Sequence, residues 1–299
     1  VLETFKDLSQ NEALKVDFIK PNSQGIIEPI KVKQALKENT VLISIMYVNN
    51  EIGTLQPINE IAGVISDFRL KLYNSKKRNT KYEILNAKYP LFHSDCVQAI
   101  QFYDCDLKKL GVDFATASAH KIYGPKGLGV LACLYPEFLS PIITGGHQED
   151  NLRSGTENVA AIVGAAQALQ LIQKEKDEIF SKISRLKNKF LEGIIKIYPK
   201  GKLNGSADQA APHILNFCFK GIDGHTLLIS LDLSGVAVSL GSACEAGSIK
   251  PSYVLCSIGL SDQDAKSSIR FSLGKNTTSN EIETTLKILN NIIKRTLNA

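Results

Sequence analysis

Short apolar runs alternate with amphipathic stretches from Leu2 to about Leu131 of this chain. Strands that alternate with helical crossovers are typical of a parallel sheet. Ligands of open parallel sheets bind beyond the carboxyl ends of the strands, so the turns after these runs are the first places to look for a functional site. The expected strands are Val41 to Tyr47, Pro90 to Ser94, Phe114 to Ser118 and Leu128 to Cys133.

A different pattern begins at Glu157. From there to about Ile197, apolar residues recur at helical spacing and predict one long helix or two consecutive helices. The pattern predicts an α/β protein with a large, mainly parallel domain over 1–157, connecting helices over 158–198 and a smaller α+β domain over 199–299. The smaller domain is expected to hold strands at 214–219, 236–239 and 268–273, and a last helix that begins with a capping box at Thr278.

The composition narrows the class of protein. Lys and Arg are spread along the chain, and the net charge is only +5, so nucleic acid is not an expected partner. A local basic stretch around Lys76 lies in residues 67–89, which we interpret as an inserted loop. We expect no membrane span and no secretory leader. The six cysteines form no Cys-x-x-Cys pair and no metal-site spacing, so reduced thiols and a cytoplasmic protein are expected.

Two charged residues follow neighbouring expected strands. Lys121 lies in the stretch SAHKIYGPKG, where a desolvated amine would have a lowered pKa and could attack an aldehyde near neutral pH. Asp95 ends the preceding strand, and a carboxylate against the ring nitrogen of a pyridoxal cofactor makes that ring an electron sink. Alone, Lys121 fits a surface lysine and Asp95 a helix N-cap. Together they match the two anchors that this cofactor requires.

Two further residues are candidates for substrate chemistry. Cys244 lies in the small-residue stretch GSACEAGS, so its thiol is expected on an exposed, mobile loop, whereas Cys133 and Cys218 lie in apolar runs and are expected to pack. Arg270 interrupts a half-apolar strand. Its guanidinium matches a carboxylate, which leaves a substrate carboxylate and a structural Asp or Glu as equal alternatives.

These pieces, in this order, resemble the cysteine desulfurases of the NifS and IscS type, which are fold-type I pyridoxal-phosphate enzymes of the class V aminotransferase family. The resemblance extends over nearly the whole chain. The segments that carry it are IMYVNNEIGT at 45–54, FHSDCVQ at 92–98, SAHKIYGPKG at 118–127, RSGT at 153–156 and GSAC at 241–244.

The resemblance implies contacts to pyridoxal 5'-phosphate. Lys121 would hold the cofactor covalently, and Asp95 would pair with the pyridine nitrogen. Asn50 and Gln98 would hydrogen-bond the phenolic oxygen of the ring.

The resemblance also implies residues for the phosphate, the substrate and the sulfur. Ser118 and His120 would bind the cofactor phosphate, and His120 joins Lys121 and Cys244 as a catalytic residue. Thr156 would reach the phosphate of a neighbouring subunit, which implies a homodimer. Arg270 would hold the carboxylate of L-cysteine.

The implied activity is a sulfurtransferase reaction that converts L-cysteine to L-alanine. Cys244 would keep the sulfur as a persulfide and pass it to an iron-sulfur scaffold or a tRNA-thiolation protein. Two alternatives remain: a selenocysteine lyase on the same scaffold, and a truncated, non-catalytic paralogue that dimerises or binds partners. The second arises because family members carry further residues ahead of the point that matches Val1, so we expect the start of the large domain to be missing.

Overall fold

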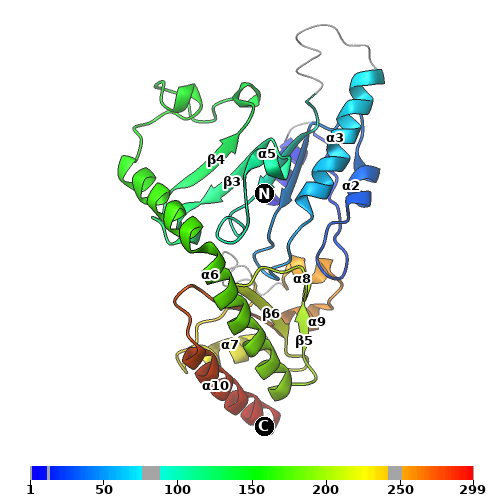
Figure 1. Cartoon of the computed structure of the whole chain (residues 1–299). Coiled ribbons are helices and arrows are strands. Elements are labelled where there is room, and N and C mark those ends of the chain that lie inside the picture. The colour runs from blue at the N-terminus through cyan, green and yellow to red at the C-terminus, as the bar shows by residue number, and fades with distance from the viewer. Residues whose placement is uncertain (1, 12–13, 76–87, 242–250, 299) are drawn as a thin grey trace.

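The computed structural model describes residues 2–11, 14–75, 88–241 and 251–298. Two sheets lie in the upper and lower halves of Figure 1, and helix α6 runs from one to the other. The upper sheet has the order β1-β2-β3-β4 and the lower sheet the order β5-β6-β7. The strands are β1 (Leu42–Met46), β2 (Leu91–Asp95), β3 (Phe114–Ser118), β4 (Gly129–Cys133), β5 (Lys202–Asn204), β6 (Ile214–Cys218) and β7 (Ser268–Ser272).

The first sheet confirms the four strands expected from the apolar runs, with ends that differ by at most one residue. Strands β1, β2 and β3 are parallel, but β4 pairs antiparallel to β3. A parallel partner would need a crossover of a dozen residues or so. The connection here runs only from Ala119 to Leu128 and holds the 3₁₀ turn η1 (Ala119–Ile122), so the chain returns as a neighbouring antiparallel strand.

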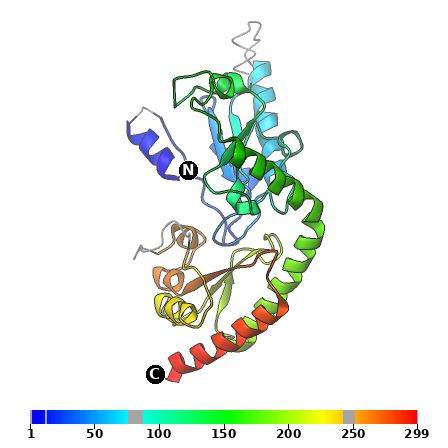
Figure 2. The ribbon, with the colours of Figure 1, turned by 90° about the vertical axis from the view of Figure 1, so that its left-hand side faces the viewer.

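One face of the first sheet is covered by helices α2 (Pro29–Ala35), α3 (Ile58–Ser75) and α5 (Leu107–Leu110), and buried side chains of these helices and of β2 and β3 form one core. An ion pair joins Arg69 of α3 to Asp113, whose carboxylate also accepts the Phe92 amide at 2.6 Å. This buried contact holds α3 against the sheet. Helix α1 (Leu2–Asn11) lies across the molecule from α6 in Figure 2.

Helix α6 (Val159–Ile197) is a single helix of 39 residues, which decides between the two expected alternatives. Its first half packs Ala168 and Ile172 against Ile122 of η1. Its second half buries apolar residues in the core of the second sheet. The helix therefore belongs to both halves, and Figure 2 shows it curving along one side of the molecule. Among the described residues, none of the helices has the length and apolar character that a membrane crossing requires.

The second sheet differs from expectation at two places. Residues 236–239 do not form a strand, because they meet β7 only at the bridge between Ser239 and Arg270. Strand β5 was missed, since three residues are too few to show an alternating pattern. The other helices are α7 (Gly224–Asp232), α8 (Tyr253–Ser257), α9 (Asp262–Lys266) and α10 (Ser279–Asn298), and the short 3₁₀ turns are η2 (Pro136–Phe138) and η3 (Glu149–Asn151).

Side-chain caps fix where the helices begin. Asn158 accepts the Ala161 amide at the start of α6, and Asp223 accepts the Thr226 amide at the start of α7. The expected capping box of α10 is present, because Thr278 accepts the Glu281 amide and the Glu281 carboxylate accepts the Thr278 amide. Each cap satisfies an amide that the helix itself leaves unpaired.

Lys187 is a buried charge between α6 and the segment before β6. Its Nζ donates to the carbonyl of Ala211 at 2.9 Å, and burial lowers its pKa from 10.5 to about 8. Below pH 8 both the folded and the unfolded chain carry this proton. Between about pH 8 and 10.5 the unfolded chain binds more protons, so folding becomes more favourable as the pH rises.

We therefore expect the free energy of unfolding to rise relative to that of Lys187→Met by about 2–3 kcal/mol across that window. Denaturant unfolding of both proteins at several pH values measures this difference. His213 lies beside Lys187, but its pKa is lowered to about 3, so it stays neutral throughout. A difference that does not change with pH would show that the Lys187 pKa is not lowered.

Candidate active site

The carboxyl ends of three parallel strands bring together most of the residues that the sequence singled out. Asp95 is the last residue of β2, the middle strand, and its register partner in β3 is Thr116. Asn50 follows β1, and Lys121 lies in η1, directly after β3. Asn50, Asp95 and Lys121 therefore share one edge of the sheet, as expected from the sequence.

The carboxylate of Asp95 is oriented by the backbone that follows it. Its Oδ1 accepts the amide of Val97 at 2.9 Å, and the chain continues as a turn. The half-buried His93 lies on the same strand. Burial lowers the pKa of His93, and the charge of Asp95 opposes that shift only in part. The Val97 amide thus fixes the position of the Asp95 carboxyl group at the strand end.

The turn after β3 presents three polar side chains. The Ser118 hydroxyl and His120 Nδ1 are 2.9 Å apart, which links the two residues predicted to bind a phosphate. Lys121 is exposed, so the described residues do not enclose its amine as the desolvation argument expected. Gly124 allows α6 to approach this turn, because a Cβ there would lie 3.2 Å from the Cβ of Ala168 on α6.

Arg270 connects the second sheet to this edge. It projects from β7, and its Nη1 donates to the backbone carbonyl of Asn50 at 2.9 Å. Its Nη2 is 3.5 Å from the hydroxyl of Ser239. Sequence reasoning offered a substrate carboxylate or a structural acid as its partner and did not anticipate this backbone carbonyl, so the role of Arg270 toward a substrate stays a prediction. The arginine therefore lies beside one of the predicted cofactor residues.

Gln98 has a partner that sequence reasoning missed. His213, directly before β6, lies with Nε2 3.0 Å from Oε1 of Gln98. The histidine ring stacks on Phe102, with ring centroids 4.8 Å apart. A single histidine in the apolar run around Ile214 was the only signal in the sequence, and it did not indicate a partner 115 residues away.

Cys244 lies outside the described residues, but both flanks of its segment are described. Ser252 donates its hydroxyl to Oε2 of Glu51 at 2.5 Å, and a Cβ built on Gly241 would lie 3.4 Å from the same oxygen. Glu51, which is buried and directly follows Asn50, was also missed. The described residues on the two sides of segment 242–250 therefore lie close to Glu51, beside the candidate site.

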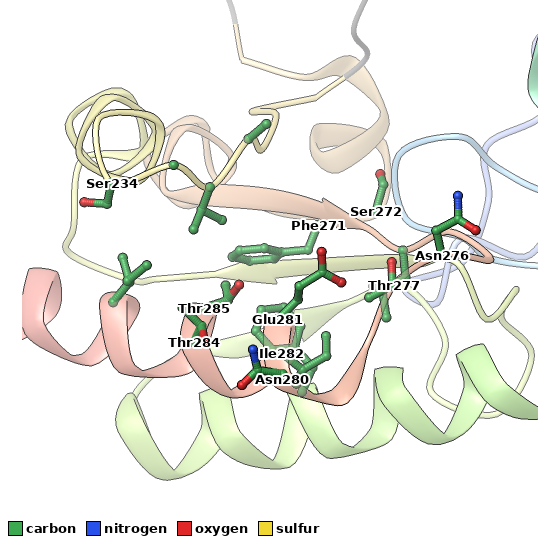
Figure 3. A pocket seen from close by; sticks show the side chains of 16 residues that line it. Ser234, Phe271, Ser272, Asn276, Thr277, Asn280, Glu281, Ile282, Thr284 and Thr285 are labelled. Carbon is green, nitrogen blue, oxygen red and sulfur yellow. The ribbon is translucent and has the colours of Figure 1, made fainter.

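Thr156 is exposed in the segment that precedes α6. Its predicted contact is to a second subunit, so its role stays a prediction. A pocket of about 540 Å³ lies elsewhere, between α10 and β7 (Figure 3). Phe271, Ile282 and Thr285 line it, and none of the predicted site residues does. Within the described ranges, no group of three His, Cys, Asp or Glu side chains is placed to hold a metal.

The charges at the strand edge suit an anionic ligand with a basic ring nitrogen. The pKa of His213 is lowered to about 3, chiefly by burial and in addition by the charges of Lys187, Arg270 and Lys121. Positive charges from both halves of the molecule thus lie near His213, the partner of Gln98. A hydroxyl and an imidazole for a phosphate, an amine for an aldehyde and a carboxylate for a pyridine nitrogen fit pyridoxal phosphate.

Comparison with known proteins gives one family. The aminotransferase class-V model matches residues 1–70 and 81–285. Cysteine desulfurase IscS of Clostridium botulinum is 38% identical over 288 residues, which are 96% of this chain and 68% of that protein. The IscS of an Enterobacter species is 37% identical over 297 residues, again 68% of its length. The chain thus spans about two thirds of these relatives.

Solved structures agree with this assignment. A NifS-like protein superposes with a TM-score of 0.83 at 32% identity, covering 99% of this chain and 72% of that one. A NifS-like protein from Rickettsia africae gives 0.82 at 30% identity and covers 98% and 73%. With the fold, the strand-edge residues and these relatives in agreement, the chain belongs to the class-V aminotransferase family, among the cysteine desulfurases of the IscS and NifS type.

Proposed function

We propose that this chain carries the catalytic residues of a pyridoxal-phosphate-dependent cysteine desulfurase. The reaction is L-cysteine plus the Cys244 thiol to L-alanine plus a Cys244 persulfide. The C–S bond of the substrate breaks, the S–S bond of the persulfide forms, and the thiol proton is conserved in the products. No outside oxidant or reductant is needed.

The observation that carries this proposal is the meeting of Asp95, Lys121 and Arg270 at one edge. Asp95 ends β2, and Lys121 lies in the turn η1 that directly follows the paired strand β3. Arg270 comes from the second sheet and reaches the backbone carbonyl of Asn50, which follows β1. They supply a carboxylate for a ring nitrogen, an amine for an aldehyde and a guanidinium for a substrate carboxylate. The 38% identity to an IscS desulfurase supports the same chemistry.

Each residue has a distinct task. Asp95, Lys121, Asn50 and Gln98 would hold the cofactor ring, and the pair of Ser118 and His120 would hold its phosphate. When bound, the cofactor supplies an electron sink for the bonds at the substrate Cα. Lys121 Nζ takes and returns the proton at that carbon.

Arg270 fixes the substrate carboxylate through a bidentate pair, in addition to its hydrogen bond to Asn50. Cys244 then accepts the sulfur. Glu51 accepts a hydrogen bond from Ser252 and lies near Gly241, so the described residues on both sides of the cysteine segment lie beside the site, which supports that role. Catalysis at this thiol requires its thiolate form.

The partners follow from the same proposal. Thr156 would contribute to the cofactor site of a second copy, so the active form is a homodimer. The persulfide would pass to a protein acceptor, either an iron-sulfur scaffold or a tRNA-thiolation protein. We place this activity in the cytoplasm, where the cysteines are expected to stay reduced.

The test is product analysis. The chain, expressed with any residues its gene encodes ahead of Val1 and reconstituted with pyridoxal phosphate, is incubated with L-cysteine and a thiol reductant. We expect alanine and sulfide in equal amounts. Alanine from L-selenocysteine alone would identify a selenocysteine lyase, and bound cofactor without alanine from either substrate would identify a non-catalytic paralogue.

A further inference from the structure

His213 is a buried histidine whose ring contacts Gln98, a residue of the candidate site. Its side chain is only 9% exposed and comes from the second sheet, where its backbone carbonyl accepts the Leu273 amide at 2.9 Å. This bond extends the β6–β7 pairing by one residue and fixes the backbone. The ring is fixed separately by stacking on Phe102. Contacts other than the one with Gln98 therefore hold both the backbone and the ring of His213 in place.

The ring of His213 carries a single N–H. Burial lowers its pKa to about 3, so the imidazole is neutral near physiological pH. A neutral imidazole has one donor and one acceptor nitrogen. Nε2 lies 3.0 Å from the Gln98 oxygen, so Nε2 carries the proton and donates it. Within the described part of the chain, Nδ1 is buried without a hydrogen-bond partner, as expected for the nitrogen that carries only a lone pair.

This hydrogen bond sets the direction of the Gln98 amide. With Oε1 occupied by His213, the NH₂ group of Gln98 points the other way. A flipped amide would give His213 Nε2–H a second donor instead of an acceptor, which leaves a buried donor unpaired at a cost of about 1–3 kcal/mol. The histidine thus selects one of two amide orientations that are otherwise similar in shape.

We propose that His213 is a positioning residue that holds Gln98 as a hydrogen-bond donor to the phenolic oxygen of the bound cofactor. The inference rests on the proposed function, since Gln98 is its cofactor contact. A carbonyl oxygen in the same place would repel the phenolate. The Gln98 amide is held in this orientation only when the second sheet packs against the turn after β2. This is because His213 and Gln98 belong to different halves of the molecule.

The test is a pH titration of the absorption spectrum of the reconstituted protein. A donor on the phenolic oxygen withdraws electron density and favours the form of the chromophore with fewer protons. His213→Phe keeps the stacking on Phe102 and removes the donor. We expect the spectral midpoint to rise by roughly 0.5–1 pH unit, the equivalent of one net hydrogen bond. His213→Gln restores an N–H donor and should return the midpoint close to wild type.

Gln98→Ala provides the reference. It should raise the midpoint at least as much as His213→Phe does, and the double variant should add little, because both changes remove one interaction. If the phenylalanine variant does not fold, His213→Leu removes the donor with less bulk. A wild-type midpoint in the histidine variant, with a shifted midpoint in Gln98→Ala, overturns this inference alone. A chain that binds no pyridoxal phosphate overturns the proposed function as well.

Discussion

Replacing Lys121 with alanine is expected to remove the covalent attachment of pyridoxal phosphate and to lower kcat for L-cysteine by about 10⁴-fold or more. The amine is the residue that would bind the aldehyde and also carry the proton at the substrate Cα. Proton transfer by a positioned group alone contributes about 10²–10⁴-fold. Losing both roles should lower kcat more than losing either role alone. The absorption of the cofactor after gel filtration and the rate of alanine formation measure the two effects.

Two neighbouring variants make this test specific. Lys126→Ala removes another exposed lysine from the same glycine-rich turn, and it should keep both colour and activity. Lys121→Arg keeps a positive charge but has no amine able to attack an aldehyde. If the arginine variant retained the covalent cofactor, or the alanine variant retained activity, Lys121 would not be the attachment site.

The part of the site that sequence could predict is the part that local pattern determines. Asp95 and Lys121 follow short apolar strands, and parallel strands end at a common edge, so their proximity follows from the pattern of strands. The capping box at Thr278 and Glu281 was also found correctly, because both residues lie within one helical turn. These features need no knowledge of how distant segments pack.

Contacts between the two halves could not be predicted in this way. The hydrogen bond from Arg270 to the Asn50 carbonyl joins residues 220 positions apart, and the contact between His213 and Gln98 spans 115. Neither side-chain type indicates its partner. A backbone carbonyl is available at every residue, so a lone arginine on a strand does not reveal which one it will reach. The buried Glu51 was missed for the same reason.

The errors in the fold have related causes. Residues 236–239 have a strand-like composition, but a strand requires a partner, and here only Ser239 finds one. Strand β4 was expected in the right place, while its antiparallel direction depends on the short connection through η1 rather than on its own residues. Composition reports the preference of a segment, and pairing depends on the rest of the chain.

The charges around the candidate site also explain why replacing Asp95 is expected to have a large effect. The charges of Lys187, Arg270 and Lys121 all act on His213, the partner of Gln98, so cations surround this side of the candidate site. A pyridine nitrogen placed among these cations would lose its proton easily. The carboxylate at the end of β2 provides the opposing charge, and its orientation by the Val97 amide fixes it in place. In the proposed site, protonation of the ring nitrogen would therefore depend on Asp95.

Asp95→Asn is expected to lower kcat/KM for L-cysteine by about 10²–10³-fold, the range for removing one preorganised electrostatic group. This corresponds to about 3–4 kcal/mol of transition-state stabilisation. Asparagine keeps the shape and an oxygen for the Val97 amide, so the fold and the covalent attachment at Lys121 should persist. The variant would be yellow and slow, whereas Lys121→Ala would be colourless. Steady-state kinetics and the absorption spectrum separate these outcomes.

Asp67→Asn is the matched control, since it neutralises an exposed acid on α3 and should leave the kinetics unchanged. Asp95→Glu retains the charge but moves it by one methylene, so we expect its activity to lie between those of the wild type and Asp95→Asn. Equal urea midpoints for wild type and Asp95→Asn would assign the loss to catalysis rather than to folding. Wild-type kinetics in Asp95→Asn would instead mean that the ring nitrogen does not depend on this carboxylate. The electron sink would then have to operate without it.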